Sequence, residues 1–129
     1  SPYAAKGLWR RELPYAKTFQ DNYLRHELMK MLNWAVGVQT GFSVNPGKLG
    51  KYLERCLPPE WWQLLLATYS DADYERTWEA LLAMGALFRM AARQVGERFG
   101  YTYPQGDDDR VSAHLRHVRA LPRDAMEMY

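Results

Sequence analysis

Two long segments of the chain carry apolar residues at helical spacing. In residues 15–40 and again in residues 72–99, apolar side chains recur at intervals of three and four positions. This period lays one apolar stripe along one face of an α-helix. The pattern therefore predicts two long helices packed in a bundle. The stripe residues are Ala16, Phe19, Tyr23, Leu28, Met31, Leu32, Ala35 and Val38 in the first segment, and Tyr74, Trp78, Leu81, Leu82, Gly85, Phe88, Ala92, Val95 and Phe99 in the second.

Glycines and small polar residues mark the ends of these two helices. Gly41 and Gly100 follow the stripes at the position where a left-handed residue commonly ends a helix. Ser70 or Asp71 is a candidate N-cap for the second helix, because its side-chain oxygen can accept a free backbone N–H. Gly85 lies inside the second stripe, and we expect it to allow close contact with a neighbouring helix.

Shorter segments complete an all-α chain. Pro14 suits the first turn of the long helix that follows it, because a residue there needs no N–H hydrogen bond. Pro58 ends one short helix and Pro59 opens the next. No segment alternates with period two. We predict a helical bundle of about five helices, two of them long. The shorter helical segments are residues 3–11, 51–57, 59–68 and 111–121.

The composition is that of one folded domain. A chain of 129 residues is of ordinary domain size, and 47% hydrophobic with 14% aromatic residues argues against disorder. The formal net charge of +2 is too balanced to indicate a nucleic-acid or membrane-surface protein, and no apolar run reaches the length of a membrane span. Cys56 is the only cysteine, so no internal disulfide forms, and a reducing, cytoplasmic setting is expected.

Residues 47–53, with the sequence GKLGKYL, form the stretch best suited to an anion. Gly47 and Gly50 let the backbone turn tightly and approach a ligand closely. Lys48 and Lys51 bring two ammonium groups to one place. A P-loop is excluded, because that motif needs glycine at position 45 and serine or threonine at position 52, and the chain has neither. The simpler alternative is a surface loop before a helix.

Asp71-Ala72-Asp73 has the D-x-D spacing of a metal site. No strand precedes it to hold both carboxylates on one edge, so we do not predict a metal here. Helix capping is the simplest role for these residues. A third interpretation takes Asp71, Asp73 and Glu75 together as an acidic cluster that faces a polycationic ligand.

His114 and His117 share one helix face, and they are the other candidate metal ligands. Zinc would need two further ligands, and Cys56 is far away in the sequence. Arg116 and Arg119 beside the histidines favour a solvated or anion-facing surface instead. We therefore predict no metal site in this chain.

No complete catalytic arrangement stands out. The sequence has no recognisable Ser/His/Asp or Cys/His set. Aromatic residues such as Trp61 and Trp62 are expected to serve the core. Because these two are adjacent on a helix, they cannot point the same way, and we expect one to be less buried than the other.

Four blocks of the chain resemble, in the same order, the C-terminal half of the aminoglycoside 6-adenylyltransferases, also called streptomycin adenylyltransferases. The resemblance covers nearly the whole chain. The blocks are residues 7–17 (GLWRRELPYAK), 47–53 (GKLGKYL), 68–75 (TYSDADYE) and 115–119 (LRHVR). The D-x-D of residues 71–73 falls in one of these blocks and so belongs to the helical half of the family.

The resemblance implies an activity and a domain organisation. Members of the family transfer AMP from ATP to a hydroxyl of streptomycin and thereby confer resistance. Their N-terminal nucleotidyltransferase domain carries carboxylates that hold Mg²⁺, and their C-terminal helical domain closes the other wall of the cleft. Residues 1–129 resemble only the second domain, and the chain does not begin with methionine. We therefore expect a piece of a larger protein that lacks the catalytic domain and is inactive alone.

The resemblance also implies roles for particular residues. The more distant streptomycin/spectinomycin adenylyltransferases use a helical-domain lysine and a tyrosine on ATP, and acidic residues on the antibiotic. The lysine corresponds to Lys48 or Lys51, and the tyrosine to Tyr69. The candidates for binding the aminoglycoside are Asp21, His26, Asp71, Asp73 and Glu75. The alternative for the whole chain is a free-standing helical interaction module with exposed tryptophan as a partner surface.

Overall fold

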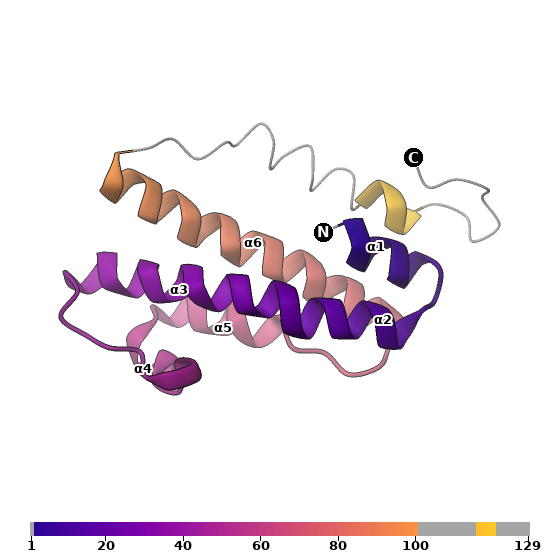
Figure 1. Ribbon diagram of the computed structural model, residues 1–129, viewed down its shortest axis with the longest axis horizontal. Helices are drawn as coiled ribbons and strands as arrows, with labels where there is room; N and C mark the ends of the chain where they lie inside the picture. The colour runs from indigo at the N-terminus through magenta and orange to yellow at the C-terminus, as the bar shows by residue number, and fades with distance from the viewer. Residues whose placement is uncertain (1, 101–115, 121–129) are drawn as a thin grey trace.

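The computed structural model describes residues 2–100 and 116–120. Two long helical runs lie side by side and point in the same direction (Figure 1). The first joins α2 (Leu13–Thr18), the π-helical segment η1 (Phe19–Leu24) and α3 (Arg25–Thr40) without a break. The second is α6 (Tyr74–Phe99). Both predicted long helices are confirmed.

The shorter helices pack around these two runs. Helix α5 (Pro59–Ala67) runs in the opposite direction beside α6, and α1 (Pro2–Trp9) packs at the end where the long run begins (Figure 1). Between α3 and α5 come η2 (Lys48–Gly50), a single 3₁₀ turn, and α4 (Leu53–Cys56). Residues 116–120 are also helical. The described ranges contain only helices and connections, as predicted. The remainder of the predicted helix over residues 111–121 lies outside them.

Three predicted helix ends are confirmed. Gly41 and Gly100 end α3 and α6 in the left-handed conformation, with φ of 64° and 80°. Each donates its N–H back to the preceding turn, which satisfies a helix carbonyl that would otherwise lack a partner. Pro14 lies in the first turn of α2.

The predicted start of the second long helix is wrong by two residues. Asp73, rather than Ser70 or Asp71, is the N-cap, and its Oδ1 accepts the Arg76 N–H at 2.9 Å. Asp71 instead accepts the N–H of Asp73 at 3.0 Å, which holds the turn before the helix. Both aspartates are therefore turn-forming residues, but only the second can cap, because its extended backbone directs the side chain to the first helical turn.

Gly85 does not mark a close helix contact, which corrects the prediction. A Cβ at this position would meet no atom within 4 Å. The buried face of α6 passes instead through Met84 and Leu87, and Gly85 is only partly covered. The glycine lies beside the buried stripe rather than in the middle of it.

Burial in the first long helix departs from the predicted stripe at η1. Tyr23, which the helical period assigns to the stripe, is 65% exposed, whereas Gln20 is fully buried. The π-helical segment explains the change, because its wider turn alters which residues face the core. The two polar side-chain atoms of Gln20 have no hydrogen-bond partner within the described part of the chain.

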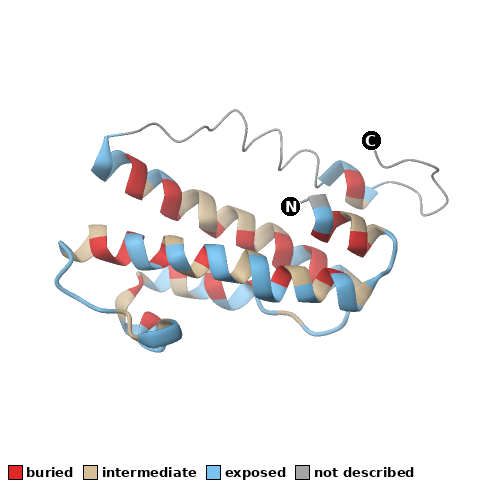
Figure 2. Ribbon diagram, in the orientation of Figure 1, coloured by how far each residue is buried: buried red, intermediate tan, exposed pale blue. Residues whose placement is uncertain are grey.

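The buried residues form two clusters (Figure 2). The larger one fills the space between α3, α5 and α6, and includes Leu32, Trp61 and Leu87. The smaller one joins α1, α2 and the start of α6, and Val118 packs into it. Trp61 is buried and Trp62 is only partly buried, as expected for adjacent positions.

None of the helices in the described ranges is both long enough and apolar enough to cross a bilayer.

Candidate functional site

Two basic side chains fasten the segment between α5 and α6, residues 68–73, to the first long helix. Arg25 donates one hydrogen bond to the Thr68 hydroxyl and another to the Thr68 carbonyl oxygen, the latter at 3.0 Å. Lys17 Nζ donates to the Ser70 carbonyl oxygen at 3.0 Å and to its hydroxyl at 3.1 Å. Because Thr68 is fully buried, this end of the segment is a fixed part of the fold.

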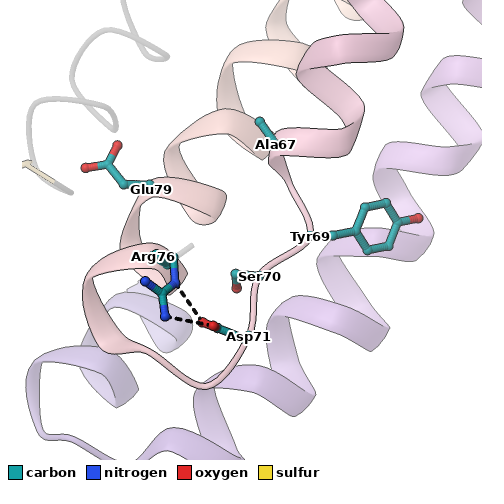
Figure 3. Close-up of a pocket in the computed structure, with 6 residues that line it drawn as sticks. All are labelled: Ala67, Tyr69, Ser70, Asp71, Arg76 and Glu79. Atoms are coloured by element: carbon teal, nitrogen blue, oxygen red, sulfur yellow. Dashed lines mark hydrogen bonds and ion pairs between the residues drawn. The ribbon is translucent and has the colours of Figure 1, made fainter.

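Tyr69 lies between these two anchored residues and projects toward the first long helix (Figure 3). The guanidinium carbon of Arg25 is 3.8 Å from the centre of its ring, a close cation–π contact. The Tyr69 side chain is nevertheless more than half exposed. Burial lowers the pKa of Arg25, while Tyr69 and Asp21 act in the opposite direction. Tyr69 is thus oriented by the protein but still accessible.

A hollow of about 500 Å³ opens beside this segment (Figure 3). Charged side chains gather on one side of its lining, whereas the Tyr69 ring points away from them, toward the first long helix (Figure 3). Within it, Asp71 and Arg76 form a paired contact, with Nε to Oδ1 at 3.0 Å and Nη2 to Oδ2 at 2.7 Å. The residues that line the hollow are Ala67, Tyr69, Ser70, Asp71, Arg76 and Glu79.

Each of the three predicted acidic residues, Asp71, Asp73 and Glu75, already has a partner among the described residues. Asp71 pairs with Arg76, and Asp73 caps α6. Glu75 accepts a hydrogen bond from Arg119 at 2.7 Å, and Arg119 also pairs with Glu79. This hydrogen bond raises the pKa of Arg119. A cationic ligand would compete with these internal cations.

The Asp71–Arg76 pair gives a pH prediction. Hydrogen bonding from Arg76 lowers the Asp71 pKa from 3.8 to about 2. Because the folded-state pKa is the lower one, the stabilisation is present above pH 3.8 and is lost as the pH falls toward about 2. NMR titration of the Asp71 carboxyl carbon should give a pKa near 2, and Arg76→Gln should return it toward 3.8. Arg93→Gln, at an exposed position on α6, is the control. An Asp71 that titrates near 3.8 in the unchanged chain would contradict this pairing.

The lysine loop, residues 47–53, adopts a conformation that needs its glycines. Gly47 has φ of 85° and ψ of 168°, a backbone region open almost only to glycine, and Gly50 has φ of 71°. The turn exposes both Lys48 and Lys51. Within residues 2–100 and 116–120, neither lysine forms an ion pair with a carboxylate. Both side chains are exposed, and the Lys51 ammonium lies 5.1 Å from the centre of the Tyr52 ring.

The lysine loop and Tyr69 border successive turns of α3. A Cβ on Gly50 would lie 2.5 Å from Met29 Cε, so the loop packs directly on Met29. Tyr69 contacts Arg25, which is four residues earlier in the sequence. Residues at this spacing lie about 5–6 Å apart on one helix face. The structure thus places the two predicted nucleotide-binding elements along the same face of one helix.

Asp21 and His26 occupy the start of this region. Asp21 is one turn before Arg25, and its carboxylate lies 3.6 Å from Lys17 Nζ. His26 is exposed next to Arg25, but among the described residues no hydrogen bond, ion pair or ring contact joins it to Tyr69 or to the lysine loop. Asp21 is therefore part of the arrangement around residues 68–73, whereas His26 is only close to it in sequence.

Sequence reasoning missed Lys17 and Arg25 as members of the site. The signal available was their spacing with Asp21, which places two cations one turn on either side of a carboxylate.

A second hollow, of about 430 Å³, was also not predicted. It lies beside the lysine loop, where Arg55 is 4.4 Å from the Tyr52 ring centre. Its lining residues are Thr40, Val44, Asn45, Tyr52, Arg55 and Cys56.

The described residues do not fit a magnesium or zinc ion. They contain no group of three His, Cys, Asp or Glu side chains arranged to hold a metal. Asp71 and Asp73 point their oxygens at N–H groups and at Arg76, so they are not free to act as ligands. His117 is exposed, and His114 lies outside the described ranges.

Comparison with known proteins supports the resemblance seen in the sequence. The family model described as streptomycin adenylyltransferase matches residues 1–118. The aminoglycoside 6-adenylyltransferase of Campylobacter jejuni is 34% identical over 106 residues, and that of Bacillus subtilis (strain 168) is 35% identical over 108 residues. These matches cover 82% and 84% of this chain but only 37% and 38% of the relatives, in their C-terminal part.

A solved structure is also similar. The crystal structure of an aminoglycoside 6-adenyltransferase from Bacillus subtilis superimposes with a TM-score of 0.77 and 30% sequence identity. The superposition covers 93% of this chain and 45% of that protein. The helical arrangement of Figure 1 is therefore one that a longer enzyme contains as a part.

Proposed function

This chain belongs to the streptomycin adenylyltransferase family, and from that premise we propose that it is the C-terminal domain of an enzyme that transfers AMP from ATP to a hydroxyl of a streptomycin-type aminoglycoside. Residues 1–129 form one wall of the cleft that holds ATP and the antibiotic. The other wall is a nucleotidyltransferase domain in the part of the enzyme that precedes this chain.

The observation that carries the proposal is that the lysine loop and Tyr69 contact residues on successive turns of α3, the loop at Met29 and Tyr69 at Arg25. Phosphate groups favour ammonium donors, and neither loop lysine is paired with a carboxylate of the described residues. The triphosphate of ATP lies along this face, bound by Lys48 or Lys51. Tyr69, which packs on Arg25 one turn earlier in α3, contacts the same nucleotide.

The aminoglycoside binds on the acidic side of the same region. A cationic antibiotic favours carboxylates and aromatic rings. Asp21 is the first candidate, because its only ion pair among the described residues, with Lys17, is a long one of 3.6 Å. Asp71 lines the hollow, and Asp73 and Glu75 follow it closely in the sequence; all three contribute negative potential, although their oxygens are partly engaged. His26, exposed next to Arg25, is a further candidate from the sequence resemblance.

The chain contributes positioning rather than the reacting groups. In the proposed enzyme, the metal and the carboxylates that activate the hydroxyl belong to the preceding domain. Holding two substrates in reactive geometry can itself supply a large part of a rate enhancement. Residues 1–129 alone are therefore inactive.

Replacing Asp21 tests the antibiotic side of the site. In the full-length protein, Asp21→Asn should raise KM for streptomycin roughly ten- to hundredfold, the loss expected for a charge-assisted hydrogen bond, and leave KM for ATP unchanged. Glu27→Gln is the matched control, because Glu27 pairs with Lys30 on another face of the helix. Steady-state kinetics with each substrate varied in turn measures both constants. An unchanged KM for streptomycin would remove Asp21 from the site.

An exposed aromatic cluster favours a second candidate, a free-standing interaction module. Trp34, Phe42 and Phe99 are each about half exposed, and their ring centres lie 5.8–6.4 Å apart. Such a cluster is typical of a surface that binds another protein. The two candidates differ in the gene: a nucleotidyltransferase domain encoded upstream in frame supports the enzyme, and its absence supports the module.

A further inference from the structure

Arg25 makes three contacts around residues 68–73, and the proposed function gives it no role of its own. Its guanidinium donates to the Thr68 hydroxyl and to the Thr68 carbonyl oxygen, and it stacks on the Tyr69 ring at 3.8 Å. The side chain is partly buried, although it carries a charge. Two hydrogen bonds and the stacking contact fix the orientation of the guanidinium. The same contact fixes the orientation of the Tyr69 ring.

We propose that Arg25 is a positioning residue, which fixes the Tyr69 ring in the orientation that contacts the nucleotide. The inference rests on the proposed function, in which Tyr69 binds ATP. Tyr69 remains 58% exposed while Arg25 stacks on it, so more than half of its surface remains available to a ligand. Arg25 itself faces Thr68 and Tyr69 and acts on the nucleotide through the tyrosine.

The contacts require arginine rather than any cation. The planar guanidinium presents parallel N–H groups to the Thr68 oxygens and a flat face to the Tyr69 ring at the same time. A lysine ammonium has no flat face and cannot make both sets of contacts. Arg25→Lys therefore keeps the charge but loses the orientation.

The neighbouring anchor provides a control for a merely structural role. Lys17 holds the same segment through Ser70 and does not contact Tyr69. Removing Lys17 loosens the segment but leaves the Arg25–Tyr69 stack in place. Removing Arg25 leaves Ser70 anchored but frees the ring. Hydrogen exchange of the two variants thus separates the holding of the segment from the orientation of the tyrosine.

A double-mutant cycle in the full-length enzyme tests the inference. Arg25→Met should raise KM for ATP about three- to thirtyfold, the range expected for a lost cation–π contact. In a Tyr69→Ala background the same change should have almost no further effect, because the residue it positions is gone. Arg25→Lys should resemble Arg25→Met, whereas Arg93→Met, at an exposed position on α6, should leave KM for ATP near its original value.

The outcomes distinguish this inference from the proposed function. If Tyr69→Ala raises KM for ATP but Arg25→Met does not, or if Arg25→Met has the same effect in both backgrounds, Arg25 does not act through Tyr69. If Tyr69→Ala leaves KM for ATP unchanged, Tyr69 does not bind the nucleotide. That result removes this part of the proposed function, and the role of Arg25 with it.

Hydrogen exchange on the 129-residue chain provides an independent readout. The Tyr69 N–H donates to the Leu66 carbonyl oxygen at 3.1 Å, so its exchange rate reports on the order of this segment. Arg25→Met should speed exchange at Tyr69 and leave the amides in the middle of α6 unchanged. Unaltered exchange at Tyr69 would overturn the proposal, and so would a uniform increase along α6, which would indicate general destabilisation.

Discussion

Replacing Lys51 with alanine in the full-length protein is expected to raise KM for ATP roughly ten- to hundredfold. A charge-assisted hydrogen bond to phosphate contributes about 1.5–3 kcal/mol, and the variant loses it. Lys51 is exposed on a loop whose glycines fix its course beside Met29, so the side chain can reach across the cleft without a change in the fold. Steady-state kinetics at varied ATP concentration measures the effect.

The same measurement decides between the two lysines of the loop. Lys48→Ala should show the large increase if Lys48 rather than Lys51 contacts the triphosphate. Lys30→Ala is the matched control, because Lys30 is an exposed lysine of α3 that pairs with Glu27. If both loop variants use ATP as well as the unchanged enzyme, the lysine loop does not bind the phosphates.

Truncating Leu87 to alanine is expected to lower the free energy of unfolding by about 2–5 kcal/mol. Leu87 is fully buried in the larger core cluster between α3, α5 and α6. The substitution removes its apolar contacts and leaves a cavity. Since small domains are stable by only about 5–15 kcal/mol, this loss is a large share of the total. Urea unfolding of the 129-residue chain, followed by circular dichroism, measures it.

Leu66→Ala is the control for this truncation. Leu66 lies on α5 with 44% of its surface exposed, and exposed substitutions usually change stability by less than about 0.5 kcal/mol. A similar loss of stability in the two variants would contradict the location of the core between α3, α5 and α6.

The long helices were predictable because their signals are local. The apolar period and the glycines at positions 41 and 100 are read within a few turns of the chain, and the structure confirms them. The π-helical segment is different. A buried Gln20 and an exposed Tyr23 contradict the hydrophobic pattern, and they arise from a change in backbone register that no stripe of apolar residues encodes.

The candidate site was predictable only in part, for a similar reason. The lysine loop contains its own turn signals, so Lys48 and Lys51 stood out in the sequence. Arg25 and Lys17 did not, because each acquires its role from a partner distant along the chain. Thr68 comes 43 residues after Arg25, and Ser70 comes 53 residues after Lys17. Only the folded arrangement shows that both hold one segment.

We propose that residues 1–129 complete the cleft of an aminoglycoside adenylyltransferase. The most direct test of this claim is an AMP-transfer assay with ATP and streptomycin, in which mass spectrometry detects the adenylylated antibiotic. Three proteins are compared: the full-length protein, the same protein without residues 1–129, and residues 1–129 alone. We predict that only the full-length protein forms adenylylated streptomycin. Transfer by the protein that lacks residues 1–129, or no transfer by the full-length protein, would contradict the claim.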